Sequence, residues 1–165
     1  MQNEWIFGCT GHINLARIKG FDEVAVRRRI SGHIKNAQGH YRVKLYCGCA
    51  DGADMLFAEE ALKCGVELIA VLPCRAEEFA PEHSDGGAEF MRILGQAKEI
   101  LIVRDEKARY LQVAKTIVEK CNELLALWDG VELPLKDGEG NSVNLGGTFD
   151  TVRMARTAQK KITLF

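Results

Sequence analysis

One apolar run followed by a glycine turn constrains the fold more than any other feature. The run is Leu-Leu-Ala-Leu-Trp at residues 124–128, and it is closed by Asp129-Gly130. A continuous apolar run of this kind predicts a strand buried on both faces, as in a parallel sheet. After a polar insertion come Gly146-Gly147-Thr148, where we expect Thr148 to cap a helix. Strand, glycine loop and helix start together suit a phosphate, because the first N–H groups of a helix point at an anion held there.

Two other apolar runs also end in glycine turns. Residues 5–7 precede Gly8-Cys9-Thr10-Gly11-His12, and residues 43–47 precede Gly48-Cys49-Ala50-Asp51-Gly52-Ala53-Asp54. We expect Asp54 to cap a helix that ends at Gly65. Each turn suits either a phosphate cradle or a tight strand-to-helix connection without a ligand, and the glycines alone do not decide between them.

Strands and helices alternate along the whole chain. This pattern predicts an α/β fold: a Rossmann-like, doubly wound, mostly parallel sheet of about six strands with helices on both faces. Further segments are a helix over 22–38, a strand over 66–72, a mobile loop over 73–87, a short helix over 90–97, a strand over 100–103, a helix over 111–121, a loop or hairpin over 131–145 and a last strand over 162–165. With a Rossmann-like strand order, the turns after the first and fifth strands meet in one crevice. That crevice would be lined by Thr10, Gly11, Gly146, Gly147 and Thr148.

Length and charge narrow the class of partner. We expect 165 residues with 47% hydrophobic residues to form a single domain over 1–165. Lysine and arginine number 22 against 23 aspartates and glutamates, so the sequence predicts neither a duplex nucleic-acid binder nor a membrane-surface binder. The expected partner is a small molecule. No signal peptide and no run near the roughly 20 apolar residues of a membrane span is present, which favours a cytoplasmic location.

The cysteines and glycine motifs predict neither a metal nor a cofactor. The six cysteines are scattered and are expected to be reduced, buried thiols. Cys47-x-Cys49 with His12 offers fewer ligands than a structural zinc site needs. The glycine turns contain no Gly-Lys-Ser/Thr sequence, and the first lacks the full GxGxxG spacing of a dinucleotide fingerprint.

Taken in order, five segments resemble the SLOG superfamily of Rossmann-like domains, which is related to the LOG "lysine decarboxylase-like" phosphoribohydrolases and to DprA-type DNA-processing proteins. They are residues 8–12, 48–54, 70–73, 126–130 and 146–148. The resemblance covers nearly the whole chain. It implies a pocket for a nucleotide or nucleotide derivative with the phosphate on Gly146-Gly147-Thr148, and related folds often form homodimers. In addition, Gly8, Gly48 and Gly52 belong to the expected ligand turns.

The chain departs from the LOG enzymes at the segment that carries their catalysis. Their PGGxGTxxE segment is reduced here to Gly146-Gly147-Thr148, without the proline, the glycine before threonine or the glutamate. Asp150 is the nearest carboxylate, and it suits ribose binding, N-glycosidic cleavage or simple stabilisation of the helix start. Tyr110 resembles a recurrent tyrosine and suits base stacking or rim packing. Asp129 is a candidate contact to base or ribose.

Two other side chains have both a chemical and a structural interpretation. Asp51 would bind a ribose hydroxyl or an active-site water, or would make the turn. His12 would serve as an acid, a base or a phosphate donor, or would be a hydrogen-bonded structural residue. Three functions stay open: a nucleotide-binding sensor or ligand-binding module, an enzyme that cleaves nucleoside monophosphates with Asp150, Asp51 or His12 as acid or base, and a DprA-like nucleic-acid binder.

Overall fold

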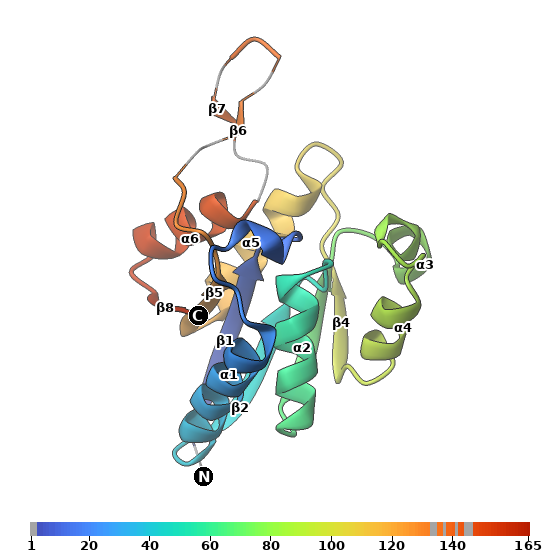
Figure 1. Cartoon of the computed structure of the whole chain (residues 1–165). Coiled ribbons are helices and arrows are strands. Elements are labelled where there is room, and N and C mark those ends of the chain that lie inside the picture. The colour runs from blue at the N-terminus through green and yellow to red at the C-terminus, as the bar shows by residue number, and fades with distance from the viewer. Residues whose placement is uncertain (1–2, 133–134, 137, 141, 144–146) are drawn as a thin grey trace.

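The computed structural model describes residues 3–132, 135–136, 138–140, 142–143 and 147–165. Its main feature is a six-stranded parallel sheet with the strand order β4-β3-β2-β1-β5-β8 (Figure 1). The strands are β1 (Glu4–Gly11), β2 (Arg42–Cys47), β3 (Glu67–Leu72), β4 (Glu99–Ile102), β5 (Glu123–Leu127) and β8 (Lys161–Leu164). The central strands are the most buried, as the apolar runs predict: all five residues of β5 are buried.

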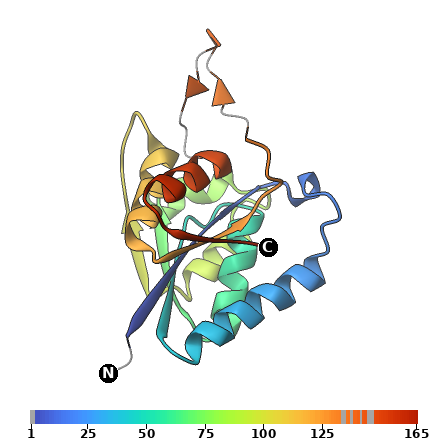
Figure 2. The ribbon, with the colours of Figure 1, turned by 90° about the vertical axis from the view of Figure 1, so that its left-hand side faces the viewer.

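Helices cover both faces of the sheet, so the predicted fold class is confirmed (Figure 2). One face carries α1 (Glu23–Gln38), α2 (Ala53–Lys63) and α4 (Ala88–Leu94), and the other carries α5 (Arg109–Lys120) and α6 (Thr148–Thr157). Each layer has its own apolar core. Phe7, Leu45 and Phe57 belong to the first, and Ile117 and Val152 belong to the second.

The spacing of apolar residues explains how the helices sit on the sheet. In α1, Val26, Ile30 and Ile34 recur every fourth residue and are buried, so one stripe of the helix faces the core. The side chain of Asp22 accepts a hydrogen bond of 3.1 Å from the Ala25 N–H and caps this helix. The helix predicted over 22–38 is therefore confirmed.

Strand β1 marks the point where the strand order reverses. Strands β2, β3 and β4 lie on one side of it, and β5 and β8 lie on the other. At its end, Gly11 is in register with Leu127, and a Cβ on Gly11 would lie 2.3 Å from the Ala53 Cβ and 2.5 Å from the Leu127 carbonyl oxygen. Only glycine lets β1, β5 and the start of α2 approach so closely. Ligand pockets of doubly wound sheets form at this kind of switch point.

Two predicted helix caps are wrong. The N-cap of α2 is Gly52, whose φ of +80° suits glycine, and Asp54 lies inside the first turn. The N-cap of α6 is Gly147, and Thr148 is the first helical residue. Both helices thus start one or two residues earlier than the side-chain caps suggest.

The segment over 73–87 is more structured than the predicted loop. It contains α3 (Ala76–Phe79) and a short 3-10 helix, η2 (Ala80–Glu82), and Phe79 and His83 are buried. A second 3-10 helix, η1 (Leu15–Arg17), follows β1. The rings of Phe79 and His83 lie 4.8 Å apart in an edge-to-face arrangement, and the His83 ring stacks on Phe90 of α4 at 4.4 Å. These ring contacts hold the segment over 73–87 against α4. The sequence does not predict them, because most residues around Phe79 and His83 are polar.

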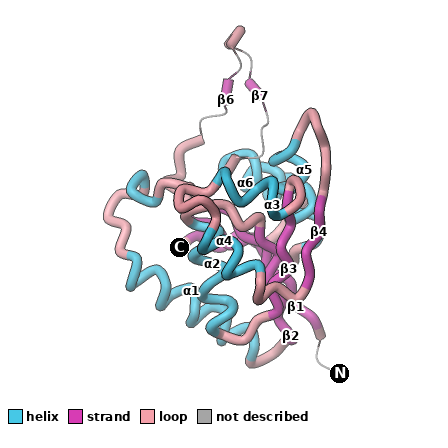
Figure 3. Tube along the Cα trace, turned by 90° about the vertical axis from the view of Figure 1, so that its right-hand side faces the viewer, coloured by secondary structure: helices cyan, strands magenta, loops and turns pink. Residues whose placement is uncertain are grey.

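The insertion after β5 contains a short hairpin. Strand β6 (Leu135–Lys136) pairs antiparallel with β7 (Ser142–Val143), and Figure 3 shows the pair standing away from the main sheet. Among the described residues, no helix is both long and apolar enough to cross a bilayer.

Candidate functional site

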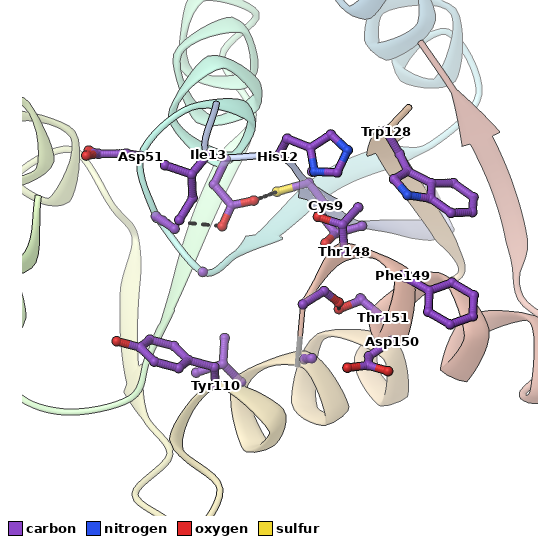
Figure 4. A pocket seen from close by; sticks show the side chains of 18 of the residues that line it. Cys9, His12, Ile13, Asp51, Tyr110, Trp128, Thr148, Phe149, Asp150 and Thr151 are labelled. Atoms are coloured by element: carbon purple, nitrogen blue, oxygen red, sulfur yellow. Dashed lines mark hydrogen bonds between the residues drawn. The ribbon is translucent and has the colours of Figure 1, made fainter. Parts of the chain in front are cut away.

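A pocket of about 790 Å³ opens at the carboxyl ends of the central strands (Figure 4). Its walls come from the turns after β1 and β2, from Pro73 after β3, from Trp128 after β5, and from the first turns of α5 and α6. The volume falls within the range of small-molecule sites, and the location is the switch point between β1 and β5.

Most of the residues singled out from the sequence lie together in this pocket. Those that line it are Thr10, Gly11, His12, Gly48, Asp51, Tyr110, Gly147, Thr148 and Asp150. Figure 4 shows His12 and Asp51 across the pocket from Tyr110 and Asp150. The side chains therefore surround a single space although they come from distant parts of the sequence.

Gly146 lies outside the described residues, and three other singled-out residues, Gly8, Gly52 and Asp129, do not line the pocket. Gly8 lies beneath α5, where a Cβ would be 2.6 Å from the Ile117 Cγ2. A Cβ on Gly52 would lie 2.2 Å from the Ile13 carbonyl oxygen. Gly8 and Gly52 thus permit close packing of the elements that build the pocket.

His12 and Asp129 form a network behind the pocket. The Nε2 atom of His12 lies 3.0 Å from Oδ1 of Asp129, and Arg17 donates to Oδ2 at 3.1 Å. The Val131 N–H donates to the Asp129 carboxylate at 3.0 Å, and with His12 and Arg17 it holds the pKa of Asp129 below its usual range. The carboxylate of Asp129 is thus engaged in orienting the imidazole that lines the pocket.

Two of the carboxylates on the pocket wall, those of Asp150 and Asp51, also have protein partners. Asp150 is only 2% exposed and pairs with Arg153 at 3.1 Å, one turn along α6. Asp51 accepts a hydrogen bond of 2.7 Å from the Ser84 N–H. This bond ties the turn after β2 to the segment after η2, so Asp51 has a structural role as well as a place in the wall.

Tyr110 joins the start of α5 to η2 across one edge of the pocket. Its hydroxyl donates to Glu82, which also accepts a bond of 2.9 Å from Arg109. Burial and the contact with Glu82 raise the pKa of Tyr110 to about 12. The phenol therefore stays neutral at physiological pH and presents its ring, 45% exposed, at the rim.

Two aromatic residues in the opposite wall escaped the sequence analysis. Trp128 and Phe149 stack at 6.2 Å with an angle of 23° between their planes. The guanidinium of Arg156 lies over Trp128, and that of Arg153 lies over Phe149. The signal was present, since Trp128 ends the apolar run and Phe149 follows Thr148, but each residue alone looks like an ordinary core residue.

Asp54, which the sequence predicted to be a helix cap, is a further residue of the site. Its carboxylate lines the pocket, and burial raises its pKa well above the usual value. It accepts a hydrogen bond of 3.3 Å from the Ala50 N–H. A Cβ on Gly48 would lie 3.0 Å from this carboxylate, so glycine at 48 makes room for it.

Comparison with solved structures supports the fold. The chain is similar to the X-ray structure of DNA processing protein A (DprA) from Streptococcus pneumoniae, with a TM-score of 0.60 and 12% sequence identity. The match covers 97% of this chain and 50% of that chain, so the chain spans about half the length of this neighbour. No protein-family model and no curated protein matches the sequence. The likeness establishes a DprA-like, Rossmann-like α/β fold.

Proposed function

We propose that the pocket binds a nucleotide or a nucleotide-derived ligand, and that the chain is a sensor or ligand-binding module of the SLOG type. The observation that carries this proposal is the position of the pocket between β1 and β5, at the start of α6. A ligand there contacts the carboxyl ends of two central strands and a helix N-terminus at once.

The start of α6 is the part of the pocket best suited to a phosphate. Gly147 is exposed, and no atom of the described residues beyond its chain neighbours lies within 4 Å of the position that a Cβ would take. The helix spans Thr148–Thr157, and the N–H groups of its first turn have no acceptor within the helix. An anion over Gly147 and Thr148 would accept from these groups and would be stabilised by the helix dipole.

The aromatic rim suits the base of such a ligand. Tyr110 stands on one side, and Trp128 and Phe149 stand on the other (Figure 4). Stacking of a base on an aromatic side chain contributes about 1–3 kcal/mol. We assign base stacking to Tyr110 because its ring is half-exposed, whereas Trp128 is buried.

The first experiment is a thermal-shift screen of the purified chain against nucleoside monophosphates, cyclic nucleotides and dinucleotides. A ligand that binds only the folded state at a hundred times its Kd adds about 2.7 kcal/mol of stability. The screen is repeated with Gly147→Asp and with Gly147→Asn as the matched control. Both side chains are favoured at an N-cap, so both variants should fold, but only aspartate repels a phosphate.

We expect a ligand-induced rise in Tm that is lost in Gly147→Asp and retained in Gly147→Asn. Equal ligand-induced rises in the Tm of the two variants would contradict the assignment of the phosphate to the start of α6. The absence of any shift across the screen would refute the nucleotide-binding proposal.

A second candidate is cleavage of the N-glycosidic bond of a nucleoside monophosphate. It is favoured by Asp150, a carboxylate that lines the pocket beside the proposed phosphate position while being 2% exposed. Asp51 and His12 are the other acid or base candidates. Chromatography of the reaction mixture would detect free base, and Asp150→Asn should stop its release while ligand binding persists. Intact nucleotide after long incubation would eliminate this candidate.

A third candidate is single-stranded nucleic-acid binding, which the likeness to a DNA processing protein suggests. The net charge of −1 weighs against it, since such proteins usually depend on positively charged grooves. Fluorescence anisotropy with a labelled single strand, measured at two salt concentrations, would detect the expected salt-sensitive affinity. No binding at low salt would eliminate it.

A further inference from the structure

Three potential metal ligands meet at the floor of the pocket from three separate elements. Cys9 lies in β1, Cys47 ends β2, and Asp54 lies in the first turn of α2. Their ligand atoms all lie within 4.8 Å of one another. The Sγ of Cys9 is 4.0 Å from Oδ1 of Asp54, a contact drawn as a dashed line from the Cys9 sulfur in Figure 4. Cys9 and Asp54 line the pocket, so the cluster borders on the ligand space.

Among the residues that the structure describes, no cationic side chain pairs with the carboxylate of Asp54. Within the described part of the chain, its side-chain contacts are the Ala50 N–H at 3.3 Å and the Cys9 thiol at 4.0 Å. Burial raises its pKa, and no basic side chain offsets this effect. A partly buried carboxylate with no cation beside it is stabilised by protonation, by pairing with a cation or by binding to a metal.

The surroundings of Cys47 favour a thiolate. The Cys49 N–H donates to the Cys47 sulfur at 3.3 Å. The Cys47 thiol itself donates to the Asp54 carbonyl oxygen at 3.4 Å, a bond that metal binding would replace. The N-terminus of α2 lies beside the cluster and adds a positive potential. The Cys49 N–H and the N-terminus of α2 both stabilise negative charge on the Cys47 sulfur, as a thiolate ligand of a metal ion requires.

We propose that Cys9, Cys47 and Asp54 bind a Zn²⁺ ion whose fourth coordination position opens into the pocket. Two thiolates and one carboxylate suit zinc, which accepts sulfur at about 2.3 Å and oxygen at about 2.0–2.2 Å. Tetrahedral bonds of these lengths place ligand atoms a little under 4 Å apart, close to the spacing in this cluster. Binding displaces the thiol protons to solvent. Three protein ligands and an open position are typical of a zinc ion that meets a water or a substrate.

The ligands differ from those that the sequence pattern brought together. The Cys49 thiol donates to the Cys47 carbonyl at 3.6 Å, and His12 is engaged by Asp129. The short Cys-x-Cys spacing is therefore misleading here, because only the first of its two thiols joins the cluster.

The test uses the metal alone, so it does not depend on the identity of the pocket ligand. The reduced, metal-free chain is titrated with Co²⁺, which gives thiolate charge-transfer absorption when cysteines coordinate it, and then with Zn²⁺ in competition. We expect one Co²⁺ per chain and its displacement by Zn²⁺. Absence of the charge-transfer band in the folded wild-type chain would overturn the proposal.

Two variants and a matched control locate the site. Cys47→Ser should weaken Co²⁺ binding by more than tenfold, whereas Cys64→Ser should leave it unchanged because Cys64 lies at the end of α2, beside Ser31. An undiminished band in folded Cys47→Ser would refute the assignment.

Asp54→Asn provides a second measurement in case Cys47→Ser does not fold. The metal-free variant should melt no lower than the wild type, because it removes a partly buried carboxylate that no cation offsets. It should also lose most of the Zn²⁺-induced rise in Tm. An equal Zn²⁺-induced rise in the variant and the wild type would contradict the proposal.

Discussion

Gly11→Ala should strongly destabilise the fold, because Gly11 is in close contact with two rigid neighbours in the switch region. Its Cβ would lie 2.3 Å from the Ala53 Cβ and 2.5 Å from the Leu127 carbonyl oxygen. Carbon atoms in good contact are about 3.5–4.0 Å apart. Neither neighbour can rotate away, since one is a Cβ and the other belongs to the backbone. The start of α2 or the end of β5 must therefore shift by more than about 1 Å.

Overpacking of this kind costs about 1–3 kcal/mol and occasionally more. The rigid neighbours of Gly11 place this variant near the upper end, at about 3 kcal/mol. A change of 1 kcal/mol moves the Tm of a chain of this length by about 2–4 °C. We therefore expect the Tm to fall by about 6–12 °C, which a melt followed by circular dichroism measures directly.

Gly32→Ala is the matched control, with the same chemical change and the opposite expected sign. Gly32 is exposed in α1, and in the described part of the chain no atom outside the neighbouring helix backbone lies within 4 Å of its Cβ position. Alanine is favoured over glycine inside a helix by about 0.5–1 kcal/mol, so Gly32→Ala should raise the Tm slightly. A Gly11→Ala protein that melts within about 1 °C of the wild type would refute the packing argument.

Two further predictions concern titrating side chains. Glu123 is 1% exposed, and although burial opposes its ionisation, bonds from Thr163, Lys161 and His33 hold its pKa below the usual value. A depressed folded-state pKa stabilises the fold above the unfolded pKa of about 4.3 and ceases to do so as the pH falls through the folded value. In urea unfolding, Glu123→Gln should therefore lower the free energy of unfolding by about 1–3 kcal/mol at pH 7, and this loss should shrink below about pH 4. A loss that does not depend on pH would contradict this reasoning. Glu82→Gln should bring the pKa of Tyr110 down from about 12 part of the way towards its usual value, because burial remains; an unchanged ultraviolet titration curve would exclude the contact.

The local pattern of the sequence was sufficient to predict the fold. Alternating strands and helices gave the parallel, two-faced sheet, and the apolar run over 124–128 identified its most buried strand. The Rossmann-like strand order, in which the first strand lies beside the fifth, is confirmed by the pairing of β1 with β5. These features follow from periodicity and from the topology rules of α/β sheets.

Contacts between side chains that are distant in the sequence could not be predicted from periodicity and topology rules. The pairing of His12 with Asp129 and the cluster of Cys9, Cys47 and Asp54 depend on strand order and on the exact start of α2. Asp54 has a side chain typical of an N-cap, but Gly52 adopts a positive φ and starts the helix earlier, which turns Asp54 inward. An offset of two residues thus separates a helix cap from a carboxylate that faces the pocket.

The central position of β1 also has a consequence for the order of folding. Strands β1 to β4 are consecutive in the chain and adjacent in the sheet, so each can join its neighbour soon after synthesis. The other side of β1 must wait for a partner far along the chain: Ile6 and Asn122 exchange two hydrogen bonds of 2.8 Å across 116 positions. Such distant contacts carry a large loop-closure entropy and form slowly. The pocket between β1 and β5 is therefore completed late, and until then the newly made half-sheet exposes an apolar edge that is prone to aggregation.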